Sequence, residues 1–136
     1  MIDPPKKIYV KRVNGKGLGV FAKDFIKSAE LIEVCPIHLL GAHHVNEDQN
    51  TFYNYAFAYP FKAKPEDRQF AICWGYGSFY NHNGSHSNAD TYDNPNDQTI
   101  SFVAIKDIQK DEEICIDYGS GWVADRKNLN IIYNIK

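Results

Sequence analysis

The chain of 136 residues is long enough for one domain with a single hydrophobic core. Its composition, 43% hydrophobic and 24% charged without a low-complexity tract, excludes an extended disordered protein. The net charge of −2 argues against a general nucleic-acid binder, which would need basic residues for phosphate contacts. No apolar segment follows Met1 or reaches membrane-spanning length, so we expect an intracellular protein without a membrane anchor.

The charges are unevenly distributed along the chain. Residues 1–30 contain seven Lys or Arg and three Asp or Glu, whereas residues 90–117 contain eight acidic residues and only Lys106 and Lys110. Such an acidic run is either a solvated face or a rim that attracts a basic partner. The sequence alone leaves both interpretations open.

The three cysteines, Cys35, Cys73 and Cys115, each lie within an apolar segment and are widely spaced. Their odd number and their spacing fit neither a disulfide framework nor a zinc-binding pattern. We therefore predict three reduced, buried thiols in a reducing compartment.

Short strands separated by turns are expected along most of the chain. Residues 8–13 have strand composition, and Asn14-Gly15 predicts a hairpin before the strand resumes at residues 20–22. A third strand is expected over 30–37, where Pro36 should place the strand at a sheet edge or end it. The expected elements after residue 40 are a helical turn at 46–49, an aromatic strand at 52–59, a charged hairpin loop at 62–68, strands at 69–73, 99–105 and 113–118, a polar loop at 90–97, and a short helix or packed tail from Gly121. This pattern predicts a compact, mostly-β domain.

Residues 73–89 form the most unusual stretch of the chain. Four aromatic residues are followed by a polar run, Asn-His-Asn-Gly-Ser-His-Ser-Asn, that has almost nothing to bury. A polar loop that follows an apolar strand either presents groups to a ligand or is a well-satisfied turn between two strands.

The glycines at 15, 17 and 19 do not form a nucleotide-binding fingerprint, because the third glycine is not at the required spacing and no helix is expected to follow. They predict either a plain glycine-rich hairpin or a backbone-lined seat for an anion.

Two other chemistries have weak support. His82 and His86 are spaced like a helical zinc pair, but Asn83-Gly84-Ser85 between them disfavours a helix. Ser78 is not part of a Gly-x-Ser-x-Gly motif. We therefore expect neither a metal site nor a serine hydrolase.

Three segments, in order, resemble the motifs of the SET domain, the fold of protein-lysine methyltransferases that use S-adenosylmethionine. Gly-Leu-Gly-Val-Phe-Ala at residues 17–22 resembles the first motif. Gly77 through Asn81-His82 to Asn88-Ala89 resembles the Asn-His-Ser…Pro-Asn signature, and Glu-Glu-Ile-Cys-Ile-Asp-Tyr-Gly at 112–119 resembles the third. The resemblance covers about residues 8–126 of a single domain over 1–136, with 127–136 as a C-terminal tail. It is closest to the minimal SET proteins of large DNA viruses and bacteria.

The resemblance implies a β-clip-like fold of short strands and small sheets, with little helix and a C-terminal pseudoknot. The pseudoknot would bring residues 73–89 beside residues 111–119, which are far away in sequence.

The resemblance also implies a site for S-adenosyl-L-methionine. The methionine part of the cofactor would be held through backbone groups of Lys16, Gly17, Leu18 and Gly19. Asn81 and His82 would bind its amino end and adenine, His82 mainly through its main chain. The substrate-lysine channel would be lined by Tyr55, Tyr118 and Trp122, with Tyr118 as the active-site phenol.

The chemistry of methyl transfer fits these residue types. The methyl donor is already activated by its sulfonium charge, so the enzyme must align a neutral amine with it. A lysine with a pKa of about 10.4 in water becomes easier to deprotonate in an aromatic channel. A tyrosine with an ordinary pKa of about 10 is a poor base. We therefore assign Tyr118 to orienting the amine and the methyl group, with water taking the proton.

The function implied is protein-lysine N-methylation of a basic peptide, with the histone H3 tail as the first expected substrate. We expect the protein to be in the nucleus if its substrate is a histone and in the cytoplasm otherwise. We expect no direct contact with nucleic acid, and we expect the protein to form a homodimer. The alternative is a catalytically silent SET module that binds a peptide or partner protein. Asn83 and Ser87 replace the Ser and Pro of the signature and favour this alternative, whereas Tyr118 and the Gly-x-Gly motif oppose it.

Overall fold

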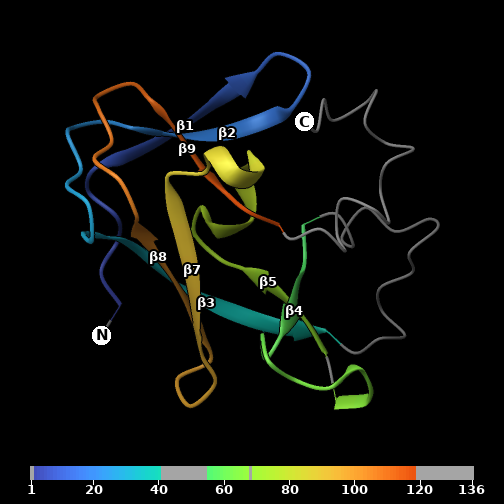
Figure 1. The fold of residues 1–136 in the computed structure, drawn as a ribbon. Helices are drawn as coiled ribbons and strands as arrows, with labels where there is room; N and C mark the ends of the chain where they lie inside the picture. Colours follow the sequence, from blue (N-terminus) through green and yellow to red (C-terminus); the bar gives the residue numbers. More distant parts are fainter. Residues whose placement is uncertain (1, 41–54, 68, 119–136) are drawn as a thin grey trace.

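The computed structural model describes residues 2–40, 55–67 and 69–118, which form two β-sheets of mostly antiparallel strands (Figure 1). One sheet has the strand order β1-β2-β9-β6 and the other the order β4-β5-β3-β8-β7. The strands are β1 (Ile8–Val13), β2 (Gly17–Ala22), β3 (Leu31–Leu40), β4 (Phe57–Tyr59), β5 (Gln69–Cys73), β6 (Asn81–His82), β7 (Ala89–Asn94), β8 (Thr99–Ala104) and β9 (Glu113–Ile116), and the short 3-10 turns are η3 (Pro65–Asp67), η4 (Gly77–Phe79) and η5 (Gly84–His86). No α-helix occurs in the described ranges, so the prediction of a mostly-β fold is confirmed.

The hairpin β1–β2 forms as the sequence predicts. Strand β1 has the predicted bounds, and its register with β2 runs from Ile8 opposite Ala22 to Val13 opposite Gly17. Gly15 and Gly17 both have φ of 80°, a backbone conformation that glycine adopts without steric cost. Strand β2 begins at Gly17, three residues before the predicted resumption at Val20.

Pro36 lies in the middle of β3, a central strand, so the prediction that it marks an edge or an end was wrong. Residues 31–36 of β3 pair with β8, and residues 37–40 pair with β5. Pro36 stands where the partner changes: its carbonyl accepts the Trp74 N–H at 2.9 Å, and the next N–H, of Ile37, donates to the Gln98 carbonyl at 3.2 Å. The missing proline N–H therefore does not interrupt the sheet.

The predicted polar loop at 90–97 is wrong for most of its length, because β7 occupies residues 89–94. Its six residues pair with β8, from Ala89 opposite Ala104 to Asn94 opposite Thr99. Strand β7 is the last strand of its sheet. Its exposed residues, Asp90, Tyr92 and Asn94, alternate with residues that are buried or partly buried. A strand that is covered on one side only carries such polar residues without cost.

The remaining predicted elements are found with smaller differences. Strand β5 has the predicted bounds, β8 and β9 fall within the predicted strands 99–105 and 113–118, and the charged loop between β4 and β5 contains η3. Strand β4 begins only at Phe57, and Tyr55 lies in a turn. The predictions for residues 46–49, 52–54 and the segment from Gly121 lie outside the described residues. None of the helices in the described part is long and apolar enough to cross a membrane.

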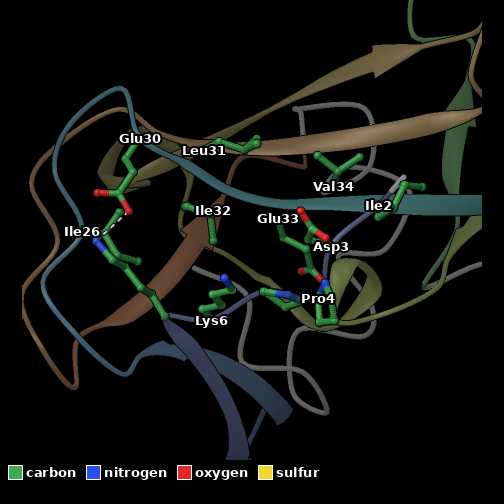
Figure 2. Close-up of a pocket in the computed structure, with 12 residues that line it drawn as sticks. Ile2, Asp3, Pro4, Lys6, Ile26, Glu30, Leu31, Ile32, Glu33 and Val34 are labelled. Carbon is green, nitrogen blue, oxygen red and sulfur yellow. Dashed lines mark ion pairs between the residues drawn. The ribbon is translucent and has the colours of Figure 1, made fainter.

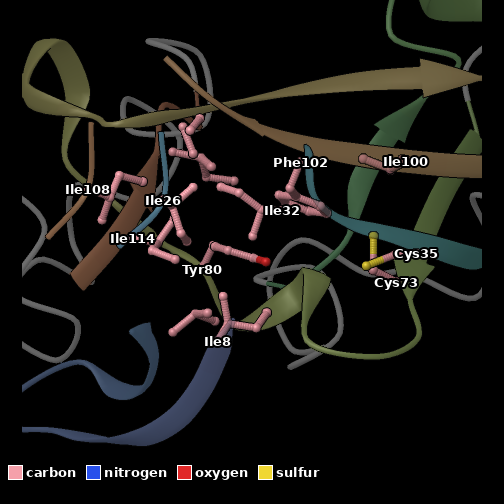
Figure 3. Close-up of a cluster of buried hydrophobic side chains, with 14 of the residues drawn as sticks. Ile8, Ile26, Ile32, Cys35, Cys73, Tyr80, Ile100, Phe102, Ile108 and Ile114 are labelled. Carbon is pink, nitrogen blue, oxygen red and sulfur yellow. The ribbon is translucent and has the colours of Figure 1, made fainter. Parts of the chain in front are cut away.

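The hydrophobic core joins residues of both sheets into one cluster (Figure 3). At its centre, the rings of Tyr80 and Phe102 stack at 4.3 Å between centroids with an interplanar angle of 12°. Burying one such aromatic side chain is worth about 1.5–3 kcal/mol. Cys35, Cys73 and Cys115 are free and buried, as predicted. Because Tyr80 directly precedes Asn81, the core fixes the start of the polar stretch.

Candidate active site

The two stretches that the resemblance places together do lie side by side. Strands β6 and β9 pair in parallel, with Asn81 opposite Cys115 and His82 opposite Ile116. The Asn83 N–H continues this contact by donating to the Ile116 carbonyl at 3.2 Å. Residues separated by more than thirty positions in sequence therefore form one edge of the four-stranded sheet.

Asn81 connects β6 to both β2 and β9. Its Nδ2 donates to the Leu18 carbonyl at 3.2 Å and to Oε2 of Glu113 at 2.7 Å. A Cβ atom at Gly19 would lie 2.9 Å from Nδ2 of Asn81 and 2.8 Å from Oε2 of Glu113, so a larger residue here would have to displace these two side chains. By contrast, apart from its chain neighbours, no described residue would lie within 4 Å of a Cβ built at Gly17.

His82 is held by Tyr118 and is buried. Its Nδ1 accepts the backbone N–H of Tyr118 at 2.9 Å, and the two rings lie 5.2 Å apart. Burial is the main cause that lowers the pKa of His82; the Lys16 ammonium adds to this, and Asp117, 3.6 Å from Nδ1, opposes it. The ring is therefore neutral at pH 7, with its proton on Nε2.

The main chain of His82 faces away from β9. The backbone groups of successive strand residues point to opposite edges, and the N–H of Asn83 points to β9. Strand β6 is the last strand of its sheet among the described residues. The N–H and C=O of His82 thus point to the outer edge, where a ligand could bind them.

Tyr118 is anchored at both ends of the residue. Its N–H donates to His82, and its hydroxyl donates to the backbone carbonyl of Tyr80. Because the hydroxyl proton points to that carbonyl, the lone pairs of the phenol oxygen are directed elsewhere and can accept a hydrogen bond.

Asn88 has a structural role that sequence reasoning missed. Its Oδ1 accepts the Cys115 N–H at 2.9 Å, and its Nδ2 donates to the Glu113 carbonyl at 2.9 Å and to Oε2 of Glu112 at 3.1 Å. The side chain thus joins the loop after β6 to β9. A buried asparagine in a polar run signals such a role, but its partners are far away in sequence.

The turn before Asn88 accommodates one departure from the signature. The hydroxyl of Ser87 donates to the Gly84 carbonyl at 2.8 Å, and the Ser87 N–H donates to the same oxygen at 3.2 Å. Ser87 therefore closes the η5 turn with hydrogen bonds where the signature has proline.

Lys16, Tyr55 and Trp122 are the predicted site residues for which the structure gives less information. Lys16 is near enough to His82 for its ammonium to lower the pKa of the imidazole. Tyr55 is 39% exposed in the turn before β4, so its place beside Tyr118 stays a prediction. Trp122 lies outside the described residues.

A cavity of about 400 Å³ lies elsewhere, between the N-terminal segment and β3 (Figure 2). It is lined by residues 2–7, Ile26 and residues 30–34, and none of the predicted site residues contributes to its wall. Lys7 and Glu30 in this wall form an ion pair at 2.8 Å. The cavity is therefore separate from the candidate site.

Comparisons with known proteins agree with this geometry. The SET domain family matches residues 17–119, which include all three motifs. A histone-lysine N-methyltransferase of Schizosaccharomyces pombe, specific for H3 lysine-37, is 29% identical over 119 residues, covering 85% of this chain and 76% of that protein. The crystal structure of a candidate histone methyltransferase of Plasmodium falciparum is similar with a TM-score of 0.64 and 30% identity, covering 86% of this chain and 96% of that one. The chain belongs to the SET domain family of protein-lysine methyltransferases.

Proposed function

We propose that this protein transfers a methyl group from S-adenosylmethionine to the ε-amino group of a lysine in a basic protein segment. The observation that carries the proposal is the parallel pairing of β6 with β9, in which Asn81 contacts the Leu18 carbonyl and His82 contacts Tyr118. The proposed cofactor residues are Lys16, Gly17, Leu18, Gly19, Asn81 and His82. The proposed residue at the reacting amine is Tyr118.

The charges and hydrogen-bonding groups of the site fit this cofactor. Among the described residues, none donates a hydrogen bond to Oδ1 of Asn81, and the Glu113 carboxylate lies beside the same amide. These two acceptors suit a cationic amino group, and the Lys16 ammonium suits a carboxylate. When bound, the cofactor supplies a methyl group that its sulfonium charge has already activated.

The hydroxyl of Tyr118 serves as an acceptor in this proposal. Its proton is donated to the Tyr80 carbonyl, so the oxygen can accept an N–H of the lysine and orient the amine. Tyr118 need not act as a base, because the lysine loses its proton to water before transfer. Holding the amine in line can supply several of the roughly 7–11 kcal/mol that proximity effects contribute.

The acidic residues near the site support a basic substrate. Asp117 precedes Tyr118 and is exposed, and Glu112 and Glu113 lie beside Asn88 and Asn81. Because the Schizosaccharomyces pombe relative is specific for H3 lysine-37, a segment of histone H3 is the first substrate to test. We further propose that the protein acts in the nucleus on this substrate and forms a homodimer, as the minimal viral SET proteins do.

The test is methyl transfer from labelled S-adenosylmethionine to a panel of histones and to H3 peptides in which each lysine is replaced by arginine in turn. We expect transfer to one lysine, and S-adenosylhomocysteine should stabilise the protein by about 2.7 kcal/mol at a hundredfold excess over its Kd. Calorimetry that detects no binding at millimolar ligand would end the enzyme proposal and favour a silent peptide-binding module.

A further inference from the structure

A buried carboxylate lies beneath the candidate site. Glu33 of β3 is only 3% exposed, although it belongs to the wall of the cavity in Figure 2. Its Oε1 accepts the Tyr80 hydroxyl at 2.8 Å, and its Oε2 accepts the Tyr76 N–H at 3.0 Å. Burial raises the pKa of Glu33, since the charged form loses its hydration. Burying this carboxylate costs free energy of desolvation, and in return the fold keeps a hydrogen-bond acceptor for the Tyr80 hydroxyl and the Tyr76 N–H.

The chain closes tightly over this carboxylate. Gly75, just before Tyr76, has φ of 78°, and a Cβ atom there would lie 2.6 Å from Oε2 of Glu33. Only glycine allows the backbone to come so near. The carboxylate is therefore the point around which the turn from β5 to η4 is folded.

Tyr80 connects Glu33 to the catalytic tyrosine. Its ring is stacked on Phe102 and its hydroxyl is held by Glu33, so the side chain is fixed in both tilt and rotation. Figure 3 shows Tyr80 within the core, among Ile8, Ile26 and Ile114. The backbone carbonyl of the same residue accepts the Tyr118 hydroxyl. Tyr80 thus touches Glu33 with its side chain and Tyr118 with its main chain.

We infer that Glu33 and Tyr80 are positioning residues, which hold the Tyr80 carbonyl where it sets the direction of the Tyr118 hydroxyl. The inference rests on the proposed function of Tyr118. An apolar pair would fill the same space without the cost of burying a carboxylate. What the hydrogen bond adds is a fixed orientation of Tyr80, and hence a fixed direction for the phenol lone pairs that meet the lysine amine.

The first test compares Tyr80→Phe with Tyr59→Phe. Both variants keep the ring and lose one buried hydroxyl; that of Tyr59 donates to the Thr99 carbonyl at 3.3 Å, whereas that of Tyr80 donates to Glu33. Because small misplacements near the reacting atoms cost up to about 100-fold, we expect Tyr80→Phe to lower kcat by roughly 10- to 100-fold, with KM unchanged. Tyr59→Phe should keep the wild-type kcat at a temperature well below the Tm of each variant.

The second test repeats Tyr80→Phe in a Tyr118→Phe background, where no hydroxyl remains to be directed. Positioning predicts no further loss of kcat there. Glu33→Gln should also lower kcat, and its loss combined with Tyr80→Phe should be smaller than the product of the two single losses, because both act through one hydrogen bond. An equal loss from Tyr80→Phe in both backgrounds would show general destabilisation and overturn the inference.

The third measurement does not depend on activity. The ¹³Cζ resonance of Tyr118, identified by its absence in Tyr118→Phe, reports the hydrogen bond of the hydroxyl by NMR. We expect it to move in Tyr80→Phe and in Glu33→Gln but not in Tyr59→Phe. If the wild type transfers no methyl group, the proposed function fails while this resonance still tests the positioning. A Tyr118 resonance that stays in place in Tyr80→Phe overturns the inference.

Discussion

In the five-stranded sheet, β7 pairs with β8 over six residues of each strand, whereas at the candidate site β6 pairs with β9 over only two. The first contact is supported by fully buried apolar side chains, such as Phe102 and Ile100 of β8. The second is short, and side chains supply what the backbone ladder lacks. Asn88 hydrogen-bonds the backbone of β9 at two residues, and the His82 ring accepts the Tyr118 N–H.

This difference tells us what each region tolerates. A hydrophobic contact depends on volume and area, so an apolar residue of similar size can replace another at modest cost. A side chain that pairs with backbone groups must keep its donor and its acceptor in place, because an unsatisfied buried group is costly. At the β6–β9 contact, the residues that hold the chain together are therefore neighbours of those that would perform the chemistry.

Phe102→Ala tests the hydrophobic support of the five-stranded sheet. The ring is fully buried against Tyr80, and removing it leaves a cavity, so the free energy of unfolding should fall by about 3–5 kcal/mol. Urea denaturation measures the change. Phe102→Leu, which keeps most of the volume, should cost much less. An alanine variant as stable as the leucine variant would show that the core collapses to fill the space.

Tyr118→Phe tests the β6–β9 region, where we expect it to affect the chemistry alone. The ring and its packing remain, so S-adenosylhomocysteine affinity should barely change. Because the lost hydroxyl counts mainly in the reacting geometry, turnover should fall on the order of 100- to 1000-fold, or about 2.7–4 kcal/mol. Single-turnover methyl transfer measures this, with the exposed Tyr92→Phe as control. Wild-type turnover in Tyr118→Phe would reduce Tyr118 to a packing residue.

Asn88→Ala tests whether the β6–β9 contact depends on one side chain. The variant leaves the buried Cys115 N–H without its partner, which should cost about 1–3 kcal/mol of unfolding free energy. Cofactor binding should weaken as well, because Asn81 and His82 lose their support. Asn94→Ala is a matched control: its amide donates to the Asp97 carboxylate at 2.9 Å in an exposed turn, and the change should be near zero. Equal costs for both variants would contradict the comparison.

The sequence predicted best what depends on neighbouring residues. Strands β1 and β5 have the predicted bounds, and the turn at Asn14-Gly15 lies where local turn chemistry requires it. The course of β3 through Pro36 could not be predicted, because it depends on a change of partner strand. Residues 90–94 were assigned to a loop, since a strand exposed on one face has the composition of a loop.

For the site, the resemblance to the SET motifs indicated Asn81, His82 and Tyr118, and these lie together. Their supports were not predicted. Glu33 and Tyr80 are 47 positions apart, and Asn81 and Leu18 are 63 apart, so no local pattern connects them. Strict alternation along a strand would expose a glutamate that follows the buried Ile32. The register shift between Leu31 and Glu33 breaks this alternation, and the turn around Gly75 then covers the carboxylate.

The smallest expected effect concerns pH, and it follows from the burial of His82. Its pKa in the folded state is lowered, first by burial, from an unfolded value of about 6.5. As the pH falls, the unfolded chain therefore takes up the proton first. The contribution of His82 to stability is complete above pH of about 6.5 and is lost as the pH falls through the folded pKa. Protonation of Nδ1 also removes the acceptor for the Tyr118 N–H, so turnover should fall over the same acidic range.

Asp117→Asn sharpens this prediction. The Asp117 carboxylate raises the pKa of His82, so its removal should lower that pKa further and move the acid limb of the kcat profile to lower pH. The movement should be small, because the Asp117 side chain is 59% exposed and solvent screens it. An NMR titration of the His82 ring measures the pKa directly. Asp24→Asn, an exposed position with the same change of charge, should leave it in place. If Asp117→Asn moves the limb to higher pH, a group other than His82 controls the acid loss, and the β6–β9 contact is not the element that protonation weakens.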